Sequence, residues 1–226
     1  MHYEIISDLD KLTEFIAWLP ELKDNEKYYC CLFARKKYSK RGELRYDVSQ
    51  MNRFLSTKER LLEKIQQLET PEGSYKIKKK AVPQESLAFY INPNPRDLEK
   101  ATYESIIGLT QMLRSNDGHF NPHAEVMSCI QRSHSKKVFL DFDVDTKDFD
   151  FKRLEHIINP ACLDIVETRG GYHILVRVAD VAPKYKKTFY NDIISLGVDQ
   201  TGDQLLPVPG CIQGGFTPRF VEVFNN

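Results

Sequence analysis

The chain has 226 residues and no formal net charge, with 41% hydrophobic and 28% charged residues. These proportions are those of a soluble globular protein with a substantial core, and no apolar run is long enough to predict a membrane span. The zero net charge argues neither for nor against a nucleic-acid partner. Five cysteines, an odd number without CxxC spacing, favour reduced thiols and a cytoplasmic location.

The amino-terminal part predicts alternating helices and strands. An amphipathic pattern over residues 9–19 predicts a helix that Ser7 caps. The aromatic and apolar segment 27–35 predicts a buried strand. Ser56 and Glu59 form a capping-box pattern ahead of regularly spaced apolar residues, so a second helix is expected there.

Two Asn-Pro pairs predict further helix starts. Residues 86–92 predict a strand, after which Asn94 is expected to cap a helix that has Pro95 in its first turn. Asn121 and Pro122 predict the start of a shorter helix in the same way.

The carboxyl-terminal part begins with a predicted strand over residues 138–144, followed by a short helix near 152–158. Two predicted strands, "CLDIVETR" and "YHILVRV", flank a Gly-Gly-Tyr sequence that favours a hairpin. A helix from about 183 to 196 and a loop-rich end follow. Mixed helices and strands with a hairpin predict an α+β fold, one compact unit with two lobes.

Two strongly basic runs lie at residues 34–45 and 76–80. Clustered lysines and arginines can follow the phosphate backbone of a nucleic acid, and lysines equally keep a surface loop soluble. The candidates for nucleic-acid binding in these runs are Arg35, Lys36, Lys76, Lys78, Lys79 and Lys80.

Three carboxylates, Asp141, Asp143 and Asp145, alternate with apolar residues in and just after the strand predicted at 138–144. Side chains two apart in a strand share a face and lie roughly 6–7 Å apart along it. Away from water such like charges repel, so one must be protonated or a cation supplied. The spacing allows two carboxylates to hold one cation, or a pair of cations roughly 3.5–4 Å apart, and oxygen ligands suit Mg²⁺ or Mn²⁺. The alternative is an edge strand with a polar face.

The segment "TRGGYHILV" places two glycines between Arg169 and His173, at the start of an apolar strand. Glycines let the backbone approach a ligand closely, so Arg169 and His173 can contact a phosphate group. A hydrogen-bonded structural role is the alternative for the histidine. The Gly/Pro-rich segment 197–215 adds a further candidate acid, although Asp, Gly and Pro are also the residues that turns prefer.

Taken in order, "VFLDFD", "TRGGYHILV" and "VDQTGDQLLPVPG" resemble the catalytic core of the archaeo-eukaryotic primase superfamily, which includes primase-polymerases of phages and plasmids. That family has an hhhDhD strand, a Gly-containing turn ending in histidine before an apolar strand, and a third aspartate ahead of a loop. The match covers roughly residues 138–215. The resemblance implies an α+β primase-like fold, in which an RRM-like catalytic module at about 121–226 packs against a smaller amino-terminal α/β lobe at about 1–120.

The resemblance also implies a catalytic site with two divalent ions, Mg²⁺ or Mn²⁺. Asp141 and Asp143 would bind these ions, and Asp199 would complete the metal site. Asp203 is the alternative third acid, and Asp145 has no assigned role.

Three further residues are implied to bind substrate. His173 would contact the triphosphate of the incoming nucleotide, with help from Arg169. The family often has a serine shortly before the histidine, and Thr168 can take its part here.

A structural zinc site is not expected. His119, His123, Cys129 and His134 form a loose cluster in the sequence, but their spacing is not that of a zinc finger. The Asn-Pro pair between the first two histidines is explained by a helix start.

The leading interpretation is a metal-dependent nucleotidyltransferase, a DNA primase or polymerase that makes or extends primers on single-stranded DNA from NTPs or dNTPs. A helicase or other replication proteins would be its partners. One alternative is a metal-dependent nuclease, since clustered acids with a histidine also serve phosphodiester hydrolysis. The other is a non-catalytic RRM-like nucleic-acid-binding replication protein. The sequence leaves open whether NTPs or dNTPs are preferred and whether synthesis starts without a primer.

Overall fold

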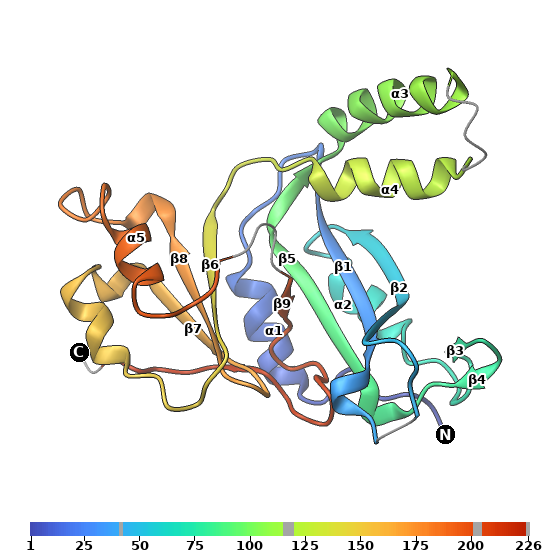
Figure 1. The fold of residues 1–226 in the computed structure, drawn as a ribbon, viewed down its shortest axis with the longest axis horizontal. Helices are drawn as coiled ribbons and strands as arrows, with labels where there is room; N and C mark the ends of the chain where they lie inside the picture. Colours follow the sequence, from blue (N-terminus) through green and yellow to red (C-terminus); the bar gives the residue numbers. More distant parts are fainter. Residues whose placement is uncertain (41–42, 115–119, 201–204, 225–226) are drawn as a thin grey trace.

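The computed structural model describes residues 1–40, 43–114, 120–200 and 205–224 (Figure 1). Helices and antiparallel sheets are mixed along the chain, which confirms the predicted α+β class. The helices are α1 (Leu9–Trp18), α2 (Leu61–Gln66), α3 (Leu98–Arg114), α4 (Pro122–Arg132) and α5 (Phe189–Ile194).

The first sheet is antiparallel and four-stranded. Its strand order is β2 (Val48–Ser56), β1 (Glu26–Arg35), β5 (Leu87–Asp97) and β9 (Leu206–Pro207). Alternate residues of β1 face opposite sides of this sheet: Cys30 and Leu32 pack with α1 and α2, whereas Tyr29 and Cys31 pack with α3 and α4. A separate hairpin of β3 (Lys76–Ile77) and β4 (Lys80–Ala81) projects at the lower right of Figure 1.

The second sheet is also antiparallel. Its strand order is β10 (Arg219–Phe220), β7 (Leu163–Glu167), β8 (Tyr172–Arg177) and β6 (Phe139–Val144). The strands β7 and β8 form the predicted hairpin, and β8 lies between β6 and β7. At the other edge of β6, Asp143 and Asp199 exchange backbone hydrogen bonds of 2.7 and 2.9 Å. A short segment after α5 therefore extends the sheet beyond β6.

Strand β6 has one apolar and one acidic face, as its alternating sequence predicts. Leu140, Phe142 and Val144 pack in a core with α5 and the segments that follow β6. Asp141 and Asp143 lie at the intervening positions and point to the opposite face of the sheet. The burial of the apolar face therefore fixes which way the carboxylates point.

Helix α1 lies between the two sheets and joins them (Figure 1). The ring centroids of Trp18 and Phe139 are 4.6 Å apart, and those of Phe15 and Phe220 are 6.1 Å apart. Residues of both sheets thus belong to one continuous hydrophobic core, which also includes Leu175 of β8. Shared burial of this kind holds the two sheets in a fixed relation.

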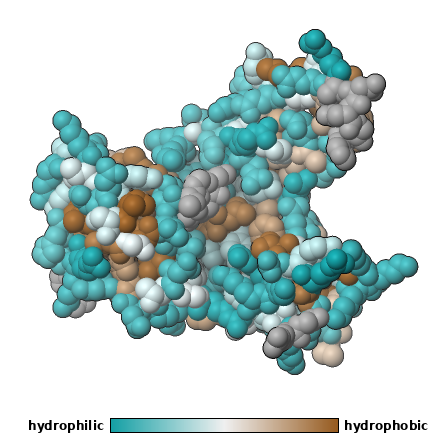
Figure 2. Space-filling view, in the orientation of Figure 1, coloured by the Kyte–Doolittle hydropathy of each residue, from teal (hydrophilic) through white to brown (hydrophobic). Residues whose placement is uncertain are grey.

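Helices α3 and α4 lie side by side and project from the first sheet as an arm (Figure 1). In Figure 2 the surface is concave between this arm and the part that carries β3 and β4. The predicted division into two modules near residue 120 stays a prediction. The structure places α4 against α3 and β5, and it returns the chain through β9 to the first sheet.

Asn94 has a different role from the predicted helix cap. Strand β5 continues to Asp97, because the residues after Asn94 still pair with β1. Asp97 accepts a hydrogen bond from Lys100 N at 3.0 Å at the start of α3. The buried Asn94 side chain instead accepts from Val138 N and Phe139 N at 2.8 and 2.9 Å, and it donates to Phe139 O at 3.0 Å. It therefore connects β5 to the start of β6.

Two other predicted caps are wrong. Helix α1 begins at Leu9, so Asp8 rather than Ser7 stands at the cap position, where its carboxylate accepts from Lys11 N at 3.1 Å. Ser56 ends strand β2, and helix α2 begins without a capping side chain. Strand β2 itself was not expected, since its side chains alternate between exposed and half-buried at the edge of the sheet.

All five cysteines are buried and carry free thiols. Within the residues that the structure describes, no helix has both the length and the apolar character that a membrane crossing requires.

Replacing Asn94 with alanine tests its role as a connection. We expect Asn94→Ala to lower the free energy of unfolding by about 2–4 kcal/mol, because two buried backbone N–H groups lose their acceptor. Urea denaturation followed by circular dichroism measures this change. Asn191→Ala, at an exposed position of α5, is the control, and it should alter the free energy by less than about 0.5 kcal/mol. Equal losses for the two variants would contradict the assigned role.

Candidate active-site cleft

Strands β6 and β8 bring two aspartates and a histidine together on one face of the second sheet. Asp143 pairs directly with His173 across the two strands, and Asp141 lies two residues earlier. The imidazole lies between the carboxylates: Nδ1 is 2.8 Å from Asp141 Oδ1, and Nε2 is 3.6 Å from Asp143 Oδ1. Asp141 and His173 are buried, whereas Asp143 is half-buried and Asp145 is exposed. Three of the predicted site residues therefore form one cluster.

The cluster shifts the pKa of its histidine and of one aspartate. Burial alone lowers the pKa of His173, but the charge of Asp141, the hydrogen bond to it and the charges of Asp143 and Asp145 outweigh burial, so this pKa is raised. Burial raises the pKa of Asp143, and the charges of Asp145 and Asp141 add to this effect against the opposing charge of His173. Both side chains therefore hold a proton more tightly than isolated ones would.

Asp141 also has an unsatisfied oxygen. Its Oδ2 is buried and has no hydrogen-bond partner among the described residues. Such an oxygen is costly, and a bound cation would remove the cost. Carboxylates are the ligands that Mg²⁺ and Mn²⁺ prefer, so Asp141 and Asp143 fit an ion of this kind. Mg²⁺ commonly takes one or two protein carboxylates together with substrate phosphates. In the described part of the chain, no three His, Cys, Asp or Glu side chains form a ready-made metal site.

The third predicted acid, Asp199, lies beside Asp143 at the edge of β6 that faces away from β8. The two residues form an antiparallel bridge, and directly opposed residues of such a pair point to the same face of a sheet. Asp199 is exposed and belongs to the face that carries Asp141 and Asp143. The alternative acid, Asp203, lies outside the described residues.

The β7–β8 turn brings its backbone close to the end of β6. A Cβ atom at Gly171 would lie 1.7 Å from Val144 O, so a glycine is required there. Thr168 is buried and lines the cleft, and its hydroxyl accepts a hydrogen bond from Gly171 N at 3.3 Å. The turn thus positions Thr168 next to the acidic cluster.

Gln213 connects this turn to the first sheet. Its Oε1 accepts a hydrogen bond from Arg169 N at 2.7 Å, and its Nε2 donates to the Tyr38 hydroxyl at 3.1 Å. The Arg169 guanidinium donates to Gly214 O and lies 4.9 Å from the centroid of the Tyr38 ring. These contacts hold two walls of a cleft in place. The predicted phosphate contact of Arg169 stays a prediction.

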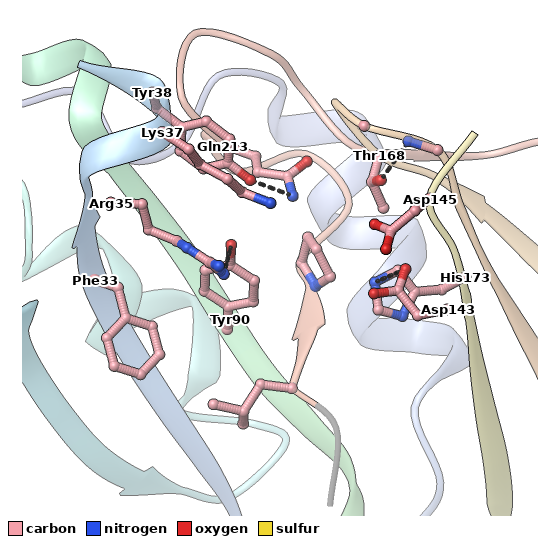
Figure 3. A pocket seen from close by; sticks show the side chains of 14 residues that line it. Phe33, Arg35, Lys37, Tyr38, Tyr90, Asp143, Asp145, Thr168, His173 and Gln213 are labelled. Atoms are coloured by element: carbon pink, nitrogen blue, oxygen red, sulfur yellow. Dashed lines mark hydrogen bonds and ion pairs between the residues drawn. The ribbon is translucent and has the colours of Figure 1, made fainter. Parts of the chain in front are cut away.

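The wall opposite the acids is cationic and aromatic (Figure 3). Arg35 and Lys37 extend from β1 and from the turn after it, and Phe33, Tyr38 and Tyr90 lie around them. Arg35 donates to the Tyr90 hydroxyl at 3.1 Å, while its Nε is buried without a hydrogen-bond partner among the described residues. The cavity between the walls has a volume of about 310 Å³.

Lys37 is electrostatically coupled to both walls. Partial burial and the charge of Arg35 lower its pKa, whereas Asp145 and Asp143 act in the opposite direction. A cleft with carboxylates on one wall and cationic side chains on the other suits a ligand that can bind a metal ion and Lys or Arg side chains at the same time. Polyphosphates have this property.

The sequence pointed to residues of the acidic wall but to few residues of the cationic wall. Among the six basic candidates, all of which the structure describes, Arg35 alone lines the cleft. Lys36 faces a different groove, and the remaining four lie on the β3–β4 hairpin. Lys37, Tyr90 and Gln213 were not predicted. Lys37 belongs to the basic run at residues 34–45, but no pattern in the sequence distinguished it from its neighbours.

The four residues considered for zinc have no common centre among those described. His119 lies outside the described residues. The other three contact separate side chains, with the pairs His123–Arg53, Cys129–Glu125 and His134–Arg96. The expected absence of zinc stays a prediction.

Comparison with known proteins provides no relative for this fold and cleft. No protein-family model matches the chain, and neither a curated protein nor a solved structure shows significant similarity to it.

Alanine at the two turn glycines tests the close approach to β6. We expect Gly171→Ala to lower the free energy of unfolding by about 2 kcal/mol or more, because the added methyl overlaps a backbone oxygen that cannot move alone. Gly170→Ala is the matched control, since a Cβ at Gly170 meets no atom of the described residues within 4 Å. Thermal unfolding of the two variants measures the difference. Equal stabilities would show that the turn does not press against β6.

The raised pKa of His173 predicts how stability depends on pH. Its contribution is fully present below the unfolded-state pKa of about 6.5, and it is lost as pH rises through the higher pKa of the folded state. The metal-free protein should therefore melt at a lower temperature as pH rises from about 6 upward. His173→Gln should weaken this dependence, whereas the exposed control His156→Gln should keep it. The same pH dependence in all three proteins would contradict the electrostatic account.

Proposed function

We propose that the chain is a divalent-metal-dependent nucleotidyltransferase that makes or extends primers on a single-stranded DNA template, as the resemblance to the primase superfamily implies. The observation that carries this proposal is the cleft, in which Asp143 and His173 face Arg35 and Lys37. Neither wall alone distinguishes a nucleotide site from other binding sites. Together they offer the groups that a metal-bound nucleoside triphosphate requires.

The acidic wall would hold the ions. Asp141 and Asp143 fit as ligands, and Asp199 lies on the same face at the neighbouring edge. Bound Mg²⁺ or Mn²⁺ would lower the pKa of an attacking hydroxyl and neutralise charge on the leaving pyrophosphate. His173 holds Asp141 in place through its 2.8 Å hydrogen bond and presents its other nitrogen on the side of Asp143.

The cationic wall would bind the substrate. Arg35 and Lys37 both line the cleft and can neutralise the triphosphate. The rings of Phe33, Tyr38 and Tyr90 offer apolar area for a base or sugar. Gln213 keeps these groups at a fixed distance from the acids. Positioning of this kind is a large part of catalysis in phosphoryl and nucleotidyl transfer.

The strand order supports the implied RRM-like module. Strand β8 lies between β6 and β7, and the segment at Asp199 adds to the other side of β6. This is the order of a split β-α-β arrangement, the same as in RRM-like sheets. Strand separation would fall to a partner such as a helicase.

A synthesis assay tests the proposal. The protein is incubated with labelled NTPs or dNTPs, a single-stranded DNA template and Mg²⁺ or Mn²⁺, with and without a primer. Products longer than the input support nucleotidyl transfer. Shorter products would instead support a metal-dependent nuclease, and binding without any product would support a non-catalytic nucleic-acid-binding protein.

Isosteric substitutions locate the chemistry. We expect Asp141→Asn with Asp143→Asn to reduce the rate of synthesis by at least about 100-fold, because the metal ligands lose their charge while the side chains keep their shape. Circular dichroism checks that the fold is intact. Synthesis by the folded double variant at the wild-type rate would show that the acids are not metal ligands.

Lys37→Ala separates substrate binding from chemistry. We expect it to raise KM for the nucleotide about tenfold with a smaller change in kcat, because a charge-assisted contact to phosphate is lost. Lys186→Ala, at an exposed position far along the chain, is the control. An unchanged KM in Lys37→Ala would show that Lys37 of the cationic wall does not contact the nucleotide.

A further inference from the structure

A second groove lies beside the β3–β4 hairpin, and it brings together Lys36, Lys78 and Lys80 from the two basic runs of the sequence. It has a volume of about 650 Å³. We call it the hairpin groove, and its lining residues are Lys36, Glu43, Leu44, Arg45, Tyr46, Ile77, Lys78, Lys80 and Ala81. Four of these side chains are cationic and one is acidic. The groove therefore has an excess of positive charge in a chain with no net charge.

Both walls of the hairpin groove are anchored to the main hydrophobic core. On one side Leu44 is buried in that core. On the other side the Tyr75 hydroxyl donates to Leu68 O at 2.8 Å, and Val82 O accepts from the Tyr3 hydroxyl at 2.8 Å. Lys80 Nζ joins the walls through a 3.3 Å hydrogen bond to Glu43 O. Anchoring on both sides makes the groove preformed, so a ligand would not have to order it.

Tyr46 presents an aromatic ring in this basic setting. The residue is 44% exposed. The cationic groups of Arg45 and Lys78 lie 5.6 and 5.7 Å from its ring centroid. An accessible ring flanked by cations combines base stacking with phosphate contact, which is how proteins bind single-stranded nucleic acids.

The hairpin tip keeps its lysines in an unfavourable backbone conformation. Lys78 and Lys79 have φ angles of 49° and 73°, in the left-handed region. A two-residue hairpin turn of this type is formed most easily by Asn-Gly, and a residue with a long side chain there is strained. Strain of this kind concentrates at functional sites. The charge at the tip is thus retained at a cost in stability.

The hairpin groove and the cleft lie on either side of one turn. Residues Lys36–Tyr38 form a single 3-10 turn at the end of β1. Lys36 lines the hairpin groove, whereas Lys37 and Tyr38 line the cleft. A ligand that leaves the cleft over this turn would therefore enter the groove. The outer part of the hairpin is mostly hydrophilic in Figure 2.

We propose that the hairpin groove binds the single-stranded nucleic acid that enters or leaves the cleft, with its base on Tyr46 and its phosphates on Lys36, Lys78 and Lys80. This inference rests on the proposed function, because it assigns the path of the template strand. Single strands are favoured over duplexes, since stacking on Tyr46 requires an unpaired base.

Fluorescence anisotropy with a labelled oligo-dT of about 20 nucleotides tests the groove directly. The protein is used without metal or nucleotide, so that catalysis is not involved. We expect Lys78→Glu with Lys80→Glu to raise Kd at least about tenfold and to reduce the salt slope of log Kd by about 1.4, which corresponds to two phosphate contacts. The matched control is Lys186→Glu with Lys187→Glu, which makes the same change of charge at exposed positions in the turn before α5.

Tyr46→Ala tests the stacking contact. It should raise Kd for oligo-dT at least about fivefold and leave Kd for a duplex of equal length unchanged. Tyr103→Ala, at another exposed tyrosine, is its control. If the two lysine pairs weaken binding equally, or if Tyr46→Ala has no effect on oligo-dT, the groove is a general anionic surface and the proposal is overturned.

Lys78→Asn with Lys79→Gly relieves the backbone strain at the hairpin tip and removes its two charges, so it tests whether the lysines are there for binding. This variant should raise the melting temperature by about 2–4 °C while weakening oligo-dT binding. A stabilised variant that binds as the wild type would contradict a binding role for the tip. Synthesis assays distinguish the failure of one proposal from the failure of the other. If the wild-type protein synthesises and the groove variants bind oligo-dT as tightly as it does, only the groove proposal is overturned. If the groove variants lose binding but the wild-type protein makes no product, only the nucleotidyltransferase proposal is overturned.

Discussion

The imidazole of His173 lies between the carboxylates of Asp141 and Asp143, and this contact depends on the register of β6 and β8. Apolar residues alternate with the acids along β6 and are buried on the other face of the sheet. A slip of one residue would bury the carboxylates in that core and expose the apolar side chains, so the register is strongly specified. In the metal-free protein the negative charges of these aspartates raise the pKa of His173, and the proton that His173 holds offsets part of their repulsion. A divalent ion would offset more of it.

The cleft exists because the second sheet is held at a fixed position relative to the first. Helix α1 packs against both sheets, Asn94 connects β5 to β6, and Gln213 connects the β7–β8 turn to Tyr38. None of these contacts is local in sequence. Together they place a cationic and aromatic wall opposite the acids, at a separation that leaves a small cavity. A weaker connection would change the spacing of the two walls before it changed the chemistry of either.

The sequence predicted the acidic wall well and the opposite wall poorly. Strand β6 and the β7–β8 hairpin have strict alternation and a glycine turn, which are local signals, and the structure confirms both. Asn94 was misassigned because an Asn-Pro pair resembles a helix start. Its conformation is decided instead by the pairing of β5 with β1 and by the hydrogen bonds of its side chain to the start of β6. Strand β2 was missed because an edge strand buries few side chains. Lys37 and Gln213 reach the cleft through contacts between distant segments, which no local pattern records.

The proposed function requires that Asp141 and Asp143 bind a divalent ion in this cleft together with a nucleotide. Electron paramagnetic resonance of Mn²⁺, titrated with protein in the presence and absence of a deoxynucleoside triphosphate, measures this directly. We expect the wild-type protein to bind Mn²⁺, the nucleotide to strengthen this binding, and the variant with asparagine at both positions to lose it. Equal Mn²⁺ binding by the wild-type protein and the double variant would show that these two aspartates are not the metal ligands.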